Sequence, residues 1–288
     1  MLGRMKQGTV PRHRQRTPLD VEAVNGRVRP VGFTVEAVGQ TGSTNTDLAH
    51  RAGCADGTVL CAEEQVAGRG RMGRTWTAPA SSQLIASISL SCPDVPPERL
   101  GLVPLLAGLS IAKGINDATG LHAELKWPND VLIGGRKLVG VLVEAAEVAP
   151  TPRLVVGFGV NYDLQRDELP VPHATSLALE VAQLGRELPR REEVLSRILV
   201  QLAEDLQRFR TLGGAPMTFM TRYKKLSATL GQEVKVMLPG DTQLLGTATD
   251  ISDSGELVVR SEDGQVRSVA AGDVIHVRPQ EDGTYSVI

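Results

Sequence analysis

The 288-residue chain is 41% hydrophobic and 22% charged, which is ordinary for a globular protein and leaves room for one large and one small domain. A net charge of −2 argues against a protein that binds nucleic acid over its whole surface, and no apolar run is long enough to cross a membrane. Three cysteines without metal-ligand spacing indicate reduced thiols, so we expect a cytoplasmic protein.

The basic N-terminal segment, residues 1–29, shows no sustained apolar period. Residues 1–30 hold seven Lys/Arg and two Asp/Glu, a balance of +5 that leaves −7 for the other 258 residues. We expect a disordered or loosely attached tail that is dispensable for activity, because so few apolar residues cannot offset the entropy of ordering. The basic run at 12–16 could touch nucleic acid, but a solvated tail is the favoured interpretation.

Alternating apolar residues at 31–35 predict the first strand of the fold. A polar triplet follows, Ser43-Thr44-Asn45, just before a segment at 46–53 that reads as a helix ending in a glycine. The triplet could cap this helix, or it could offer hydroxyl and amide groups to a polar ligand. The residues alone leave both interpretations open.

The most distinctive stretch is the arginine loop, defined here as Gly68-Arg69-Gly70-Arg71-Met72-Gly73-Arg74-Thr75-Trp76, which follows a predicted strand at 58–63. Glycines let main-chain N–H groups approach a ligand, and arginines offer planar charged forks to phosphate or carboxylate oxygens. We expect an anion-binding loop that is disordered when empty and closes over its ligand. A solvated basic loop that binds nothing is the alternative.

The same letters satisfy the dinucleotide-binding pattern Gly-x-Gly-x-x-Gly, with Asp94 at a suitable sequence distance for a ribose contact. That pattern must open a helix, however, and the residues at 75–79 include a proline and do not read as a helix start. A Rossmann site is therefore disfavoured.

Three longer elements supply the predicted core. Residues 83–91 alternate in character and predict a strand that has both faces covered or one face lining a cavity. Apolar residues at helical spacing predict two long helices, 98–119 and 190–212, which end at Gly120 and at Gly213-Gly214.

A second charged stretch, Lys126-Trp127-Pro128-Asn129-Asp130, leads into a predicted hairpin. Its tight turn is Gly134-Gly135, and Lys137 begins the second strand. A lysine near a hairpin tip is usually exposed and idle. Here the neighbouring Asn129 and Asp130, together with a close-approach position at Gly140, favour a buried cationic site.

The rest of the chain changes character near Leu226. Before it, the strand at 154–161 is interrupted by glycines, so its backbone is expected to be approached closely by a ligand or another strand. After it, short alternating runs predict a small β barrel. The predicted barrel turns are Pro239-Gly240-Asp241, Asp253-Ser254-Gly255, Glu262-Asp263-Gly264 and Ala271-Gly272-Asp273. We therefore divide the chain into a tail at 1–29, a catalytic domain at 30–226 and a barrel at 227–288.

Four motifs stand in one chain in this order: the arginine loop, Lys126–Asp130, Arg136–Gly140 and Gly157–Asn161. Together they resemble biotin protein ligases over residues 31–288. The resemblance implies an α/β (α+β) catalytic domain with a mixed sheet, followed by an SH3-like barrel. It also implies a two-step reaction: biotin and ATP give biotinyl-5′-AMP and pyrophosphate, and a specific lysine of a biotin carboxyl carrier domain then attacks the acyl adenylate.

Attack of a carboxylate on an α-phosphate brings two anions together, so fixed cations and Mg²⁺ must offset the repulsion. The resemblance assigns the arginines of the loop to the adenylate, Lys137 to a bridge between the biotin carboxylate and the α-phosphate, and Asp130 to the acceptor lysine, which must be neutral to attack. The residues implied to bind biotin are Ser43, Thr44, Asn45, Gln65, Arg69, Arg71, Ser87, Lys137 and Gly140. Those implied to bind the nucleotide are Arg69, Arg71, Arg74, Trp76, Asn129, Lys137, Asn161 and Arg278. Those implied to be catalytic are Lys137, Arg71 and Asp130.

Bifunctional members of this family carry an N-terminal winged-helix domain, whereas only 42 residues precede Ser43 and they lack its pattern. We expect a monofunctional ligase without a membrane or nucleic-acid partner, and a homodimer is compatible with the sequence. One alternative is a lipoyl or octanoyl ligase or transferase, which shares the catalytic fold but is not expected to carry the arginine loop. Another is a DNA-binding regulator that senses biotinyl-5′-AMP, recognisable by salt-dependent operator binding.

Overall fold

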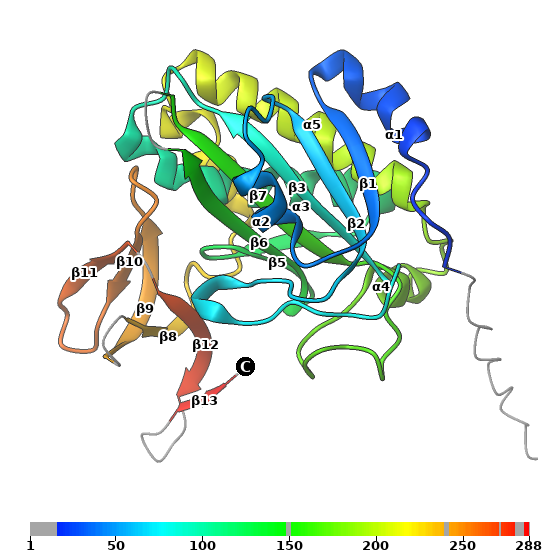
Figure 1. Cartoon of the computed structure of the whole chain (residues 1–288). Coiled ribbons are helices and arrows are strands. Elements are labelled where there is room, and N and C mark those ends of the chain that lie inside the picture. The colour runs from blue at the N-terminus through cyan, green and yellow to red at the C-terminus, as the bar shows by residue number, and fades with distance from the viewer. Residues whose placement is uncertain (1–15, 148–150, 239–241, 271, 280–284, 288) are drawn as a thin grey trace, which may run out of the picture.

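The computed structural model describes residues 16–147, 151–238, 242–270, 272–279 and 285–287. Within these ranges the chain forms a seven-stranded mixed sheet with helices packed against it, and a second sheet of six antiparallel strands (Figure 1). The predicted fold class is confirmed. No helix in the described ranges combines the length and the apolar character needed to span a membrane.

The large sheet has the order β1-β2-β3-β7-β6-β5-β4, in which β1 and β2 pair parallel and the other neighbours pair antiparallel. Its strands are β1 (Thr34–Thr41), β2 (Thr58–Gln65), β3 (Gln83–Ser91), β4 (Ala123–Lys126), β5 (Asp130–Ile133), β6 (Arg136–Glu147) and β7 (Arg153–Asn161). The helices are α1 (Val21–Val28), α2 (Thr44–His50), α3 (Val103–Thr119), α4 (Leu177–Gln183), α5 (Arg191–Thr211) and α6 (Met220–Leu226).

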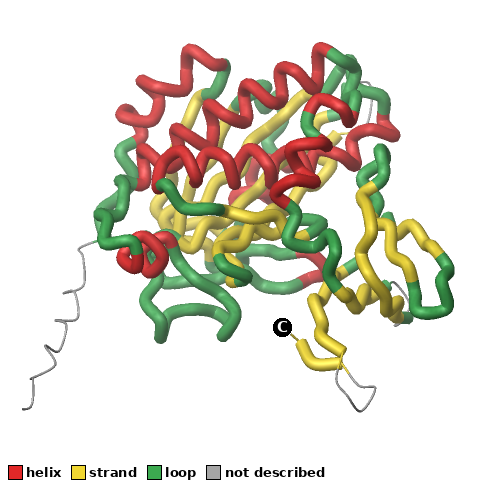
Figure 2. Tube along the Cα trace, turned by 180° about the vertical axis from the view of Figure 1, so that it is seen from behind, coloured by secondary structure: helices red, strands yellow, loops and turns green. Residues whose placement is uncertain are grey.

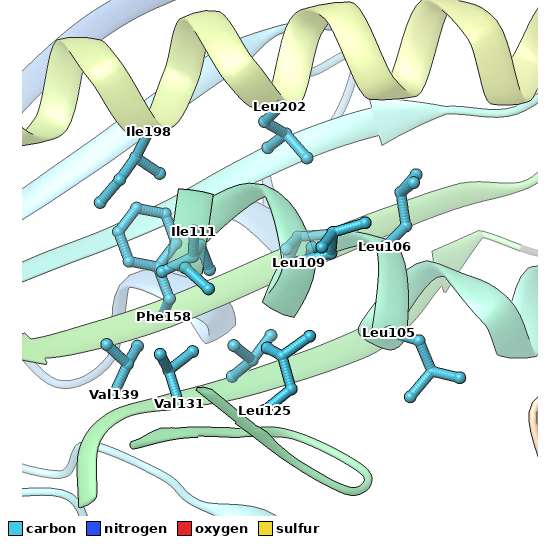
Figure 3. Packing of buried hydrophobic residues seen from close by; sticks show 14 of the residues in the cluster. Leu105, Leu106, Leu109, Ile111, Leu125, Val131, Val139, Phe158, Ile198 and Leu202 are labelled. Atoms are coloured by element: carbon cyan, nitrogen blue, oxygen red, sulfur yellow. The ribbon is translucent and has the colours of Figure 1, made fainter. Parts of the chain in front are cut away.

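The two predicted core helices, α3 and α5, lie side by side across one face of the sheet, as the view from behind shows (Figure 2). They can approach closely because Gly114 of α3 has no side chain: a Cβ there would lie 2.6 Å from the Cα of Ile198. Leu109 of α3 and Leu202 of α5 are buried in the same cluster as Phe158 of the sheet (Figure 3). This layer makes the sheet a rigid support for whatever lies on its other face.

Cross-strand rows of side chains alternate between the two faces of the central strands. One row is buried beneath the helices and consists of Val131, Val139, Val160 and Leu84. The adjacent row lines a cavity on the opposite face and consists of Asp130, Gly140, Gly159 and Ile85. Of the two interpretations left open for residues 83–91, the strand with one face lining a cavity is therefore correct.

The glycine-rich turns fall where the sequence predicts them. Gly134 and Gly135 have φ values of 53° and 76° and join β5 to β6, so the predicted hairpin is confirmed and Lys137 is the second residue of β6. The first strand begins later than expected, at Thr34. The reason is a short 3₁₀ turn at Arg29–Val31, which Gly32 ends with a φ of 92°.

The second sheet has the order β11-β10-β9-β8-β12-β13 and forms the C-terminal SH3-like domain. Its strands are β8 (Glu233–Met237), β9 (Gln243–Ile251), β10 (Leu257–Arg260), β11 (Val266–Val269), β12 (Asp273–Pro279) and β13 (Tyr285–Val287). The predicted turns at 253–255 and 262–264 connect β9 to β10 and β10 to β11. The turn expected at 239–241, and Ala271 of the last turn, lie outside the described residues. The division of the chain at 226/227 remains our proposal.

Trp127 joins the two sheets at the end of β4. Its indole Nε1 donates to the carbonyl oxygen of Gly255 in the barrel at 2.9 Å, and its backbone N–H donates to the Thr229 hydroxyl at 3.0 Å. The Thr229 hydroxyl also lies 3.2 Å from Nε2 of His276 on β12. Trp127 is 2% exposed. Its hydrogen bonds attach the barrel directly beside the charged stretch that contains this residue.

The N-terminal segment contradicts the expected disorder from residue 16 onward. Asp20 caps α1 by accepting from the backbone N–H of Ala23 at 3.0 Å, and Val24 and Val28 are completely buried. The Asn25 side chain exchanges two hydrogen bonds with the backbone of β1, at 2.8 and 2.9 Å. The expectation was wrong because a helix of two turns buries too few apolar residues to produce a recognisable period. Residues 1–15 lie outside the described residues.

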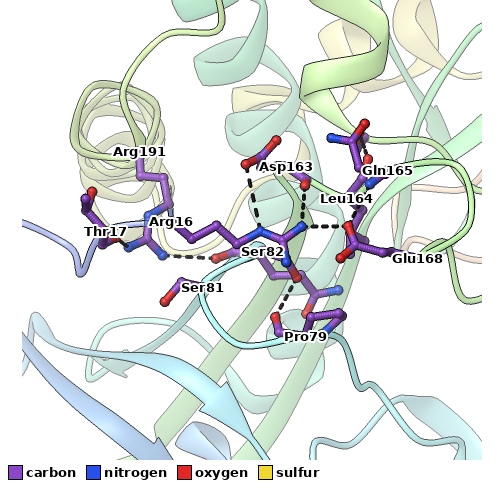
Figure 4. A network of polar contacts seen from close by, with 12 residues as sticks. Arg16, Thr17, Pro79, Ser81, Ser82, Asp163, Leu164, Gln165, Glu168 and Arg191 are labelled. Carbon is purple, nitrogen blue, oxygen red and sulfur yellow. Dashed lines mark hydrogen bonds and ion pairs between the residues drawn. The ribbon is translucent and has the colours of Figure 1, made fainter. Parts of the chain in front are cut away.

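The stretch before α1 is fixed by two arginines (Figure 4). The Arg16 guanidinium donates to the Asp163 carbonyl at 2.8 Å and to the Glu168 carboxylate at 2.6 Å. Arg191 of α5 donates to the carbonyl of Thr17, and it pairs with Glu63 of β2 at 2.9 Å. These contacts tie residues 16–20 to the ends of strands that also form the cavity.

Candidate active site

A cavity of about 620 Å³ lies on the face of the large sheet opposite α3 and α5. The start of α2, the arginine loop, the central strands and β12 of the barrel all contribute to its walls. It brings together these residues predicted for the site: Ser43, Thr44, Asn45, Gln65, Arg69, Arg71, Arg74, Trp76, Ser87, Asn129, Asp130, Lys137, Gly140 and Asn161. The side chain of Arg278, on β12, lies outside the described part of the structure.

The polar triplet at the start of α2 both caps the helix and faces the cavity. Ser43 is the N-cap, and its hydroxyl accepts from the backbone N–H of Thr46 at 3.5 Å. The Thr44 backbone N–H donates to the Gln65 side-chain oxygen at 2.8 Å, and its hydroxyl lies 2.7 Å from that of Ser87. Helix capping and a polar surface toward the cavity are therefore compatible, because the Ser43 hydroxyl caps the helix while Thr44 and Asn45 line the cavity.

Glycines in β6 and β7 form a flat floor beneath two side chains. A Cβ on Gly159 would lie 2.3 Å from the Trp76 indole nitrogen, and one on Gly140 would lie 3.0 Å from the same ring. A Cβ on Gly157 would lie 2.0 Å from the Asn45 side-chain oxygen. This backbone is approached closely by the protein's own side chains rather than by another strand. The approach of a ligand remains a prediction.

Replacing Gly159 by alanine is expected to displace Trp76, because the added methyl group and the indole cannot occupy the same space. We expect the fluorescence of Trp76 to shift to longer wavelength as the ring gains water contact. The buried Trp127 supplies a constant background. Gly101→Ala is the matched control, since nothing lies within 4 Å of a Cβ there. An unchanged spectrum in Gly159→Ala would show that the floor does not position the ring.

The arginine loop folds back on itself like a small hairpin. The backbone N–H of Trp76 donates to the carbonyl of Gly68 at 2.8 Å, and a Cβ on Gly68 would lie 2.1 Å from the Trp76 oxygen. Met72 and Gly73 turn the chain with φ values of 55° and 73°. One short 3₁₀ turn, at 71–73, stands where a Rossmann fold needs a helix, so the rejection of that fold is confirmed.

Each arginine of the loop contacts a different part of the scaffold. The pairs are Arg69 with Glu144 of β6 (3.4 Å), Arg71 with Asn129 (3.3 Å) and Arg74 with Asp273 of β12. Glu144 also accepts from the Asn45 side chain at 2.9 Å, which links the loop to the polar triplet. The sequence analysis missed Glu144 and Asp273, because only the tertiary structure brings them to the loop. Disorder of the loop without ligand remains a prediction.

Lys137 lies at the centre of the cavity wall. Its Nζ is 2.7 Å from Oδ1 of Asp130 and 5.5 Å from the centre of the Trp76 ring. Oδ1 of Asp130 is buried, and the Lys137 ammonium is its charged partner within the described residues. The expected buried cationic site is present, with the Lys137 side chain 23% exposed.

The barrel side of the cavity adds a group of ionisable side chains that the sequence analysis did not assign. They are Lys126, His173, Asp273 and His276. Burial, and then repulsion by Lys126, lowers the pKa of His276 to about 4. Burial, followed by repulsion from Lys126 and Lys137, also lowers the pKa of His173. Both imidazoles are therefore neutral at pH 7, and the positive charge here comes from lysine.

The lowered pKa of His276 predicts a loss of stability in acid. The unfolded state binds a proton below its ordinary pKa of 6.5, whereas the folded state does so only near pH 4. We therefore expect the free energy of unfolding to fall as the pH decreases from 6.5 to 4. His276→Gln should flatten this part of the profile in urea titrations. His50→Gln, on the exposed end of α2, is the control. Equal slopes in all three proteins would contradict the prediction.

Comparison with known proteins decides the family. Residues 39–161 match the biotin/lipoate A/B protein ligase family, and residues 229–277 match the biotin protein ligase C-terminal domain. The biotin–[acetyl-CoA-carboxylase] ligase of Mycobacterium tuberculosis is 38% identical over 276 residues, which are 93% of this chain and 99% of the relative. The chain belongs to the biotin protein ligase family.

Two further comparisons agree. A biotin–[acetyl-CoA-carboxylase] ligase of Paracoccus denitrificans is 31% identical over 78% of this chain and 94% of its own length. A solved structure of biotin protein ligase from Aquifex aeolicus, in complex with biotin and ATP, superposes with a TM-score of 0.70 at 28% identity. That match covers 83% of this chain and 97% of the other. The resemblance, and the ligase activity that it implies, are confirmed.

Proposed function

We propose that the cavity holds biotin and ATP along one face of the sheet, joins them as biotinyl-5′-AMP, and then passes biotin to a lysine of a biotin carboxyl carrier domain. The observation that carries this proposal is the position of Lys137. Its ammonium lies beside Asp130 and 5.5 Å from the centre of the Trp76 ring, in the same cavity as a cluster of uncharged polar groups and the cationic loop. A fixed cation in this cavity can offset the repulsion between a carboxylate and a phosphate.

The polar cluster suits the ureido ring of biotin. A urea offers one carbonyl acceptor and two N–H donors, and Thr44, Asn45, Gln65 and Ser87 supply hydroxyl and amide groups of both kinds. Trp76 lies over Gly140 and Gly159 and gives an apolar wall for the remaining rings and the chain. Ser43 lines the same end of the cavity while its hydroxyl caps α2.

In the first step a biotin carboxylate oxygen attacks the α-phosphorus of ATP. The bond from that phosphorus to the bridging oxygen breaks, and its electron pair leaves with pyrophosphate. Lys137 offsets the repulsion between the two reacting anions, and Arg69, Arg71 and Arg74 close over the adenylate. Binding of the adenosine part is assigned to Asn129, Asn161, Trp76 and Arg278.

In the second step the neutral amine of the acceptor lysine attacks the carbonyl carbon of the adenylate, and AMP leaves. Asp130 is assigned to this lysine, because it lines the cavity beside Lys137 and its carboxylate is a group that can take a proton from the incoming amine. The acceptor is a biotin carboxyl carrier domain. We place the reaction in the cytoplasm, where ATP is supplied, and a homodimer remains part of the proposal.

Mg²⁺ is assigned to the polyphosphate of ATP. This ion commonly keeps several waters and binds through one or two carboxylates together with substrate phosphates. Asp130 and Asp273 are carboxylates that line the cavity, so the residues present fit such an ion. When bound, it would neutralise part of the phosphate charge. The protein's own residues supply the orientation and the remaining positive charge.

Pyrophosphate–ATP exchange on the purified chain tests the proposed function. The assay is run with biotin, with lipoate and with neither acid. We expect exchange that requires biotin, because adenylate formation must be reversible for label to enter ATP. Exchange that requires lipoate would show instead that the polar cluster and the arginine loop do not set specificity for biotin, and exchange with neither acid would contradict the proposed first step.

A further inference from the structure

A chain of hydrogen bonds leads from Glu144 of β6 into the polar cluster of the cavity. The Asn45 side-chain nitrogen donates to the Glu144 carboxylate at 2.9 Å. The Ser87 hydroxyl donates to the Asn45 side-chain oxygen at 2.6 Å and lies 2.7 Å from the Thr44 hydroxyl. Thr44, Asn45 and Ser87 are buried, so these groups must satisfy one another. We call the four side chains, Glu144, Asn45, Ser87 and Thr44, the polar relay.

Two acceptors on β6 fix the orientation of the Asn45 amide. Its nitrogen donates to the Glu144 carboxylate and, at 3.3 Å, to the carbonyl oxygen of Leu142. A carboxylate accepts hydrogen bonds and donates none, so a flipped amide would place its oxygen against two acceptors. The amide oxygen instead lies over Gly157, where a Cβ would come within 2.0 Å of it. Asn45 therefore presents an acceptor to Ser87.

This orientation sets the direction of the protons further along the relay. A hydroxyl has one proton, and Ser87 uses it on the Asn45 oxygen. Ser87 can then only accept at its contact with Thr44, so the Thr44 hydroxyl donates to it. The same proton is therefore unavailable to Oε1 of Gln65, which lies 3.0 Å from the Thr44 hydroxyl and accepts from the Thr44 backbone N–H at 2.8 Å. Both oxygens, of Thr44 and of Gln65, keep a lone pair for a ligand.

Two neighbouring acceptors of this kind favour a ligand that donates. Thr44 and Gln65 both line the cavity. With the Thr44 proton turned toward Ser87, the two oxygens face each other without a proton between them, and a donor that enters relieves their repulsion. The ureido ring of biotin carries two N–H donors beside one carbonyl, so it matches this pair. The opposite order of protons would spend one acceptor on the Thr44 hydroxyl and weaken the match.

We propose that Glu144 is a positioning residue for biotin: its carboxylate, acting through the relay, makes Thr44 and Gln65 acceptors for the ureido N–H groups. This inference rests on the proposed function, since it concerns the part of the cavity assigned there to biotin. The same carboxylate also lies 3.4 Å from Arg69, and that ion pair is a separate contact. The relay needs an acceptor oxygen at position 144, whereas the ion pair needs a negative charge.

That difference provides the test, read as the dissociation constant of biotin from calorimetry without ATP. Glu144→Met removes both the acceptor and the charge and should raise this constant about tenfold, the effect of one hydrogen bond. Glu144→Gln removes the charge but still offers Asn45 an oxygen, so it should keep most of the wild-type affinity. Any change in the KM for ATP should be the same in both variants. Glu36→Met is the control, because Glu36 pairs with Arg51 at an exposed position.

A double substitution tests the route through the relay. Ser87→Ala interrupts the relay at its centre, so Glu144→Met should have little further effect on biotin affinity in that background. Effects that simply add would mean that Glu144 acts by another route and would overturn the proposal.

The remaining outcomes are distinguishable. An unchanged biotin affinity in Glu144→Met would overturn the proposal, and equal losses in the Met and Gln variants would assign the effect to the ion pair with Arg69 instead. If Glu144→Met does not fold, Glu144→Ser replaces it with the same expected results, because the shorter side chain does not reach Asn45. Failure of the wild-type protein to bind biotin or to catalyse biotin-dependent exchange would count against the proposed function, whatever the variants do.

Discussion

Lys137→Ala and Arg71→Ala are each expected to lower biotin-dependent pyrophosphate–ATP exchange by about 100- to 1,000-fold, the range for removing one preorganised charge stabiliser. Lys137 lies 2.7 Å from Asp130 and Arg71 lies 3.3 Å from Asn129, so each cation has a neighbour that can orient it toward the cavity. Their loss removes the charge that offsets repulsion between a carboxylate and a phosphate. The fall should appear in kcat as well as in kcat/KM.

The fold should survive these two substitutions. Both side chains face the cavity, and neither belongs to the buried cluster beneath α3 and α5. Circular dichroism and the urea midpoint check this. Lys113→Ala is the matched control, because this lysine pairs with Asp117 on the exposed side of α3. Exchange that continues at the wild-type rate in either site variant would mean that the cavity has been misassigned.

Deletion of residues 1–29 is expected to destabilise the protein severely, contrary to the dispensable tail predicted from composition. Burial of Val24 and Val28 alone is worth roughly 3–6 kcal/mol, which is a large share of a stability of about 5–15 kcal/mol. The deletion also removes both hydrogen bonds between Asn25 and β1. Urea unfolding should show a much lower midpoint or no cooperative transition.

The control is deletion of residues 1–15, which leaves every contact described here in place, beginning with Arg16. We expect this shorter deletion to unfold at the wild-type midpoint. Asn25→Ala gives an intermediate case, since it leaves two backbone groups of Val35 without their buried partners. If the longer deletion kept the wild-type midpoint and exchange activity, α1 would be an accessory element and the original expectation would stand.

The N-terminal segment shows why local pattern can mislead. Its basic residues suggested a solvated tail, yet Arg16 is bound by Asp163 and Glu168, which lie about 150 positions further along the chain. Charge alone cannot tell a solvated arginine from one that is paired at long range. The same reasoning explains why Glu144 and Asp273 were missed as partners of the arginine loop.

The sequence by itself determined the elements whose signals are local. Alternation and helical spacing predicted the strand at 83–91 and the long helices, and paired glycines predicted the turn before Lys137. The arginine loop and the stretch that begins at Lys126 carried enough chemistry to indicate the family, because they bring charged and glycine residues together in short runs. None of these inferences required a distance between remote residues.

Only the tertiary structure decided how those motifs meet. It placed Trp76 over Gly140 and Gly159, and it paired Arg74 with Asp273 of the barrel. Such relations depend on strand order, register and the attachment of the second domain, which connect residues far apart in the chain. Composition and spacing carry no information about them, because ion pairing and burial depend on distances that exist only after folding.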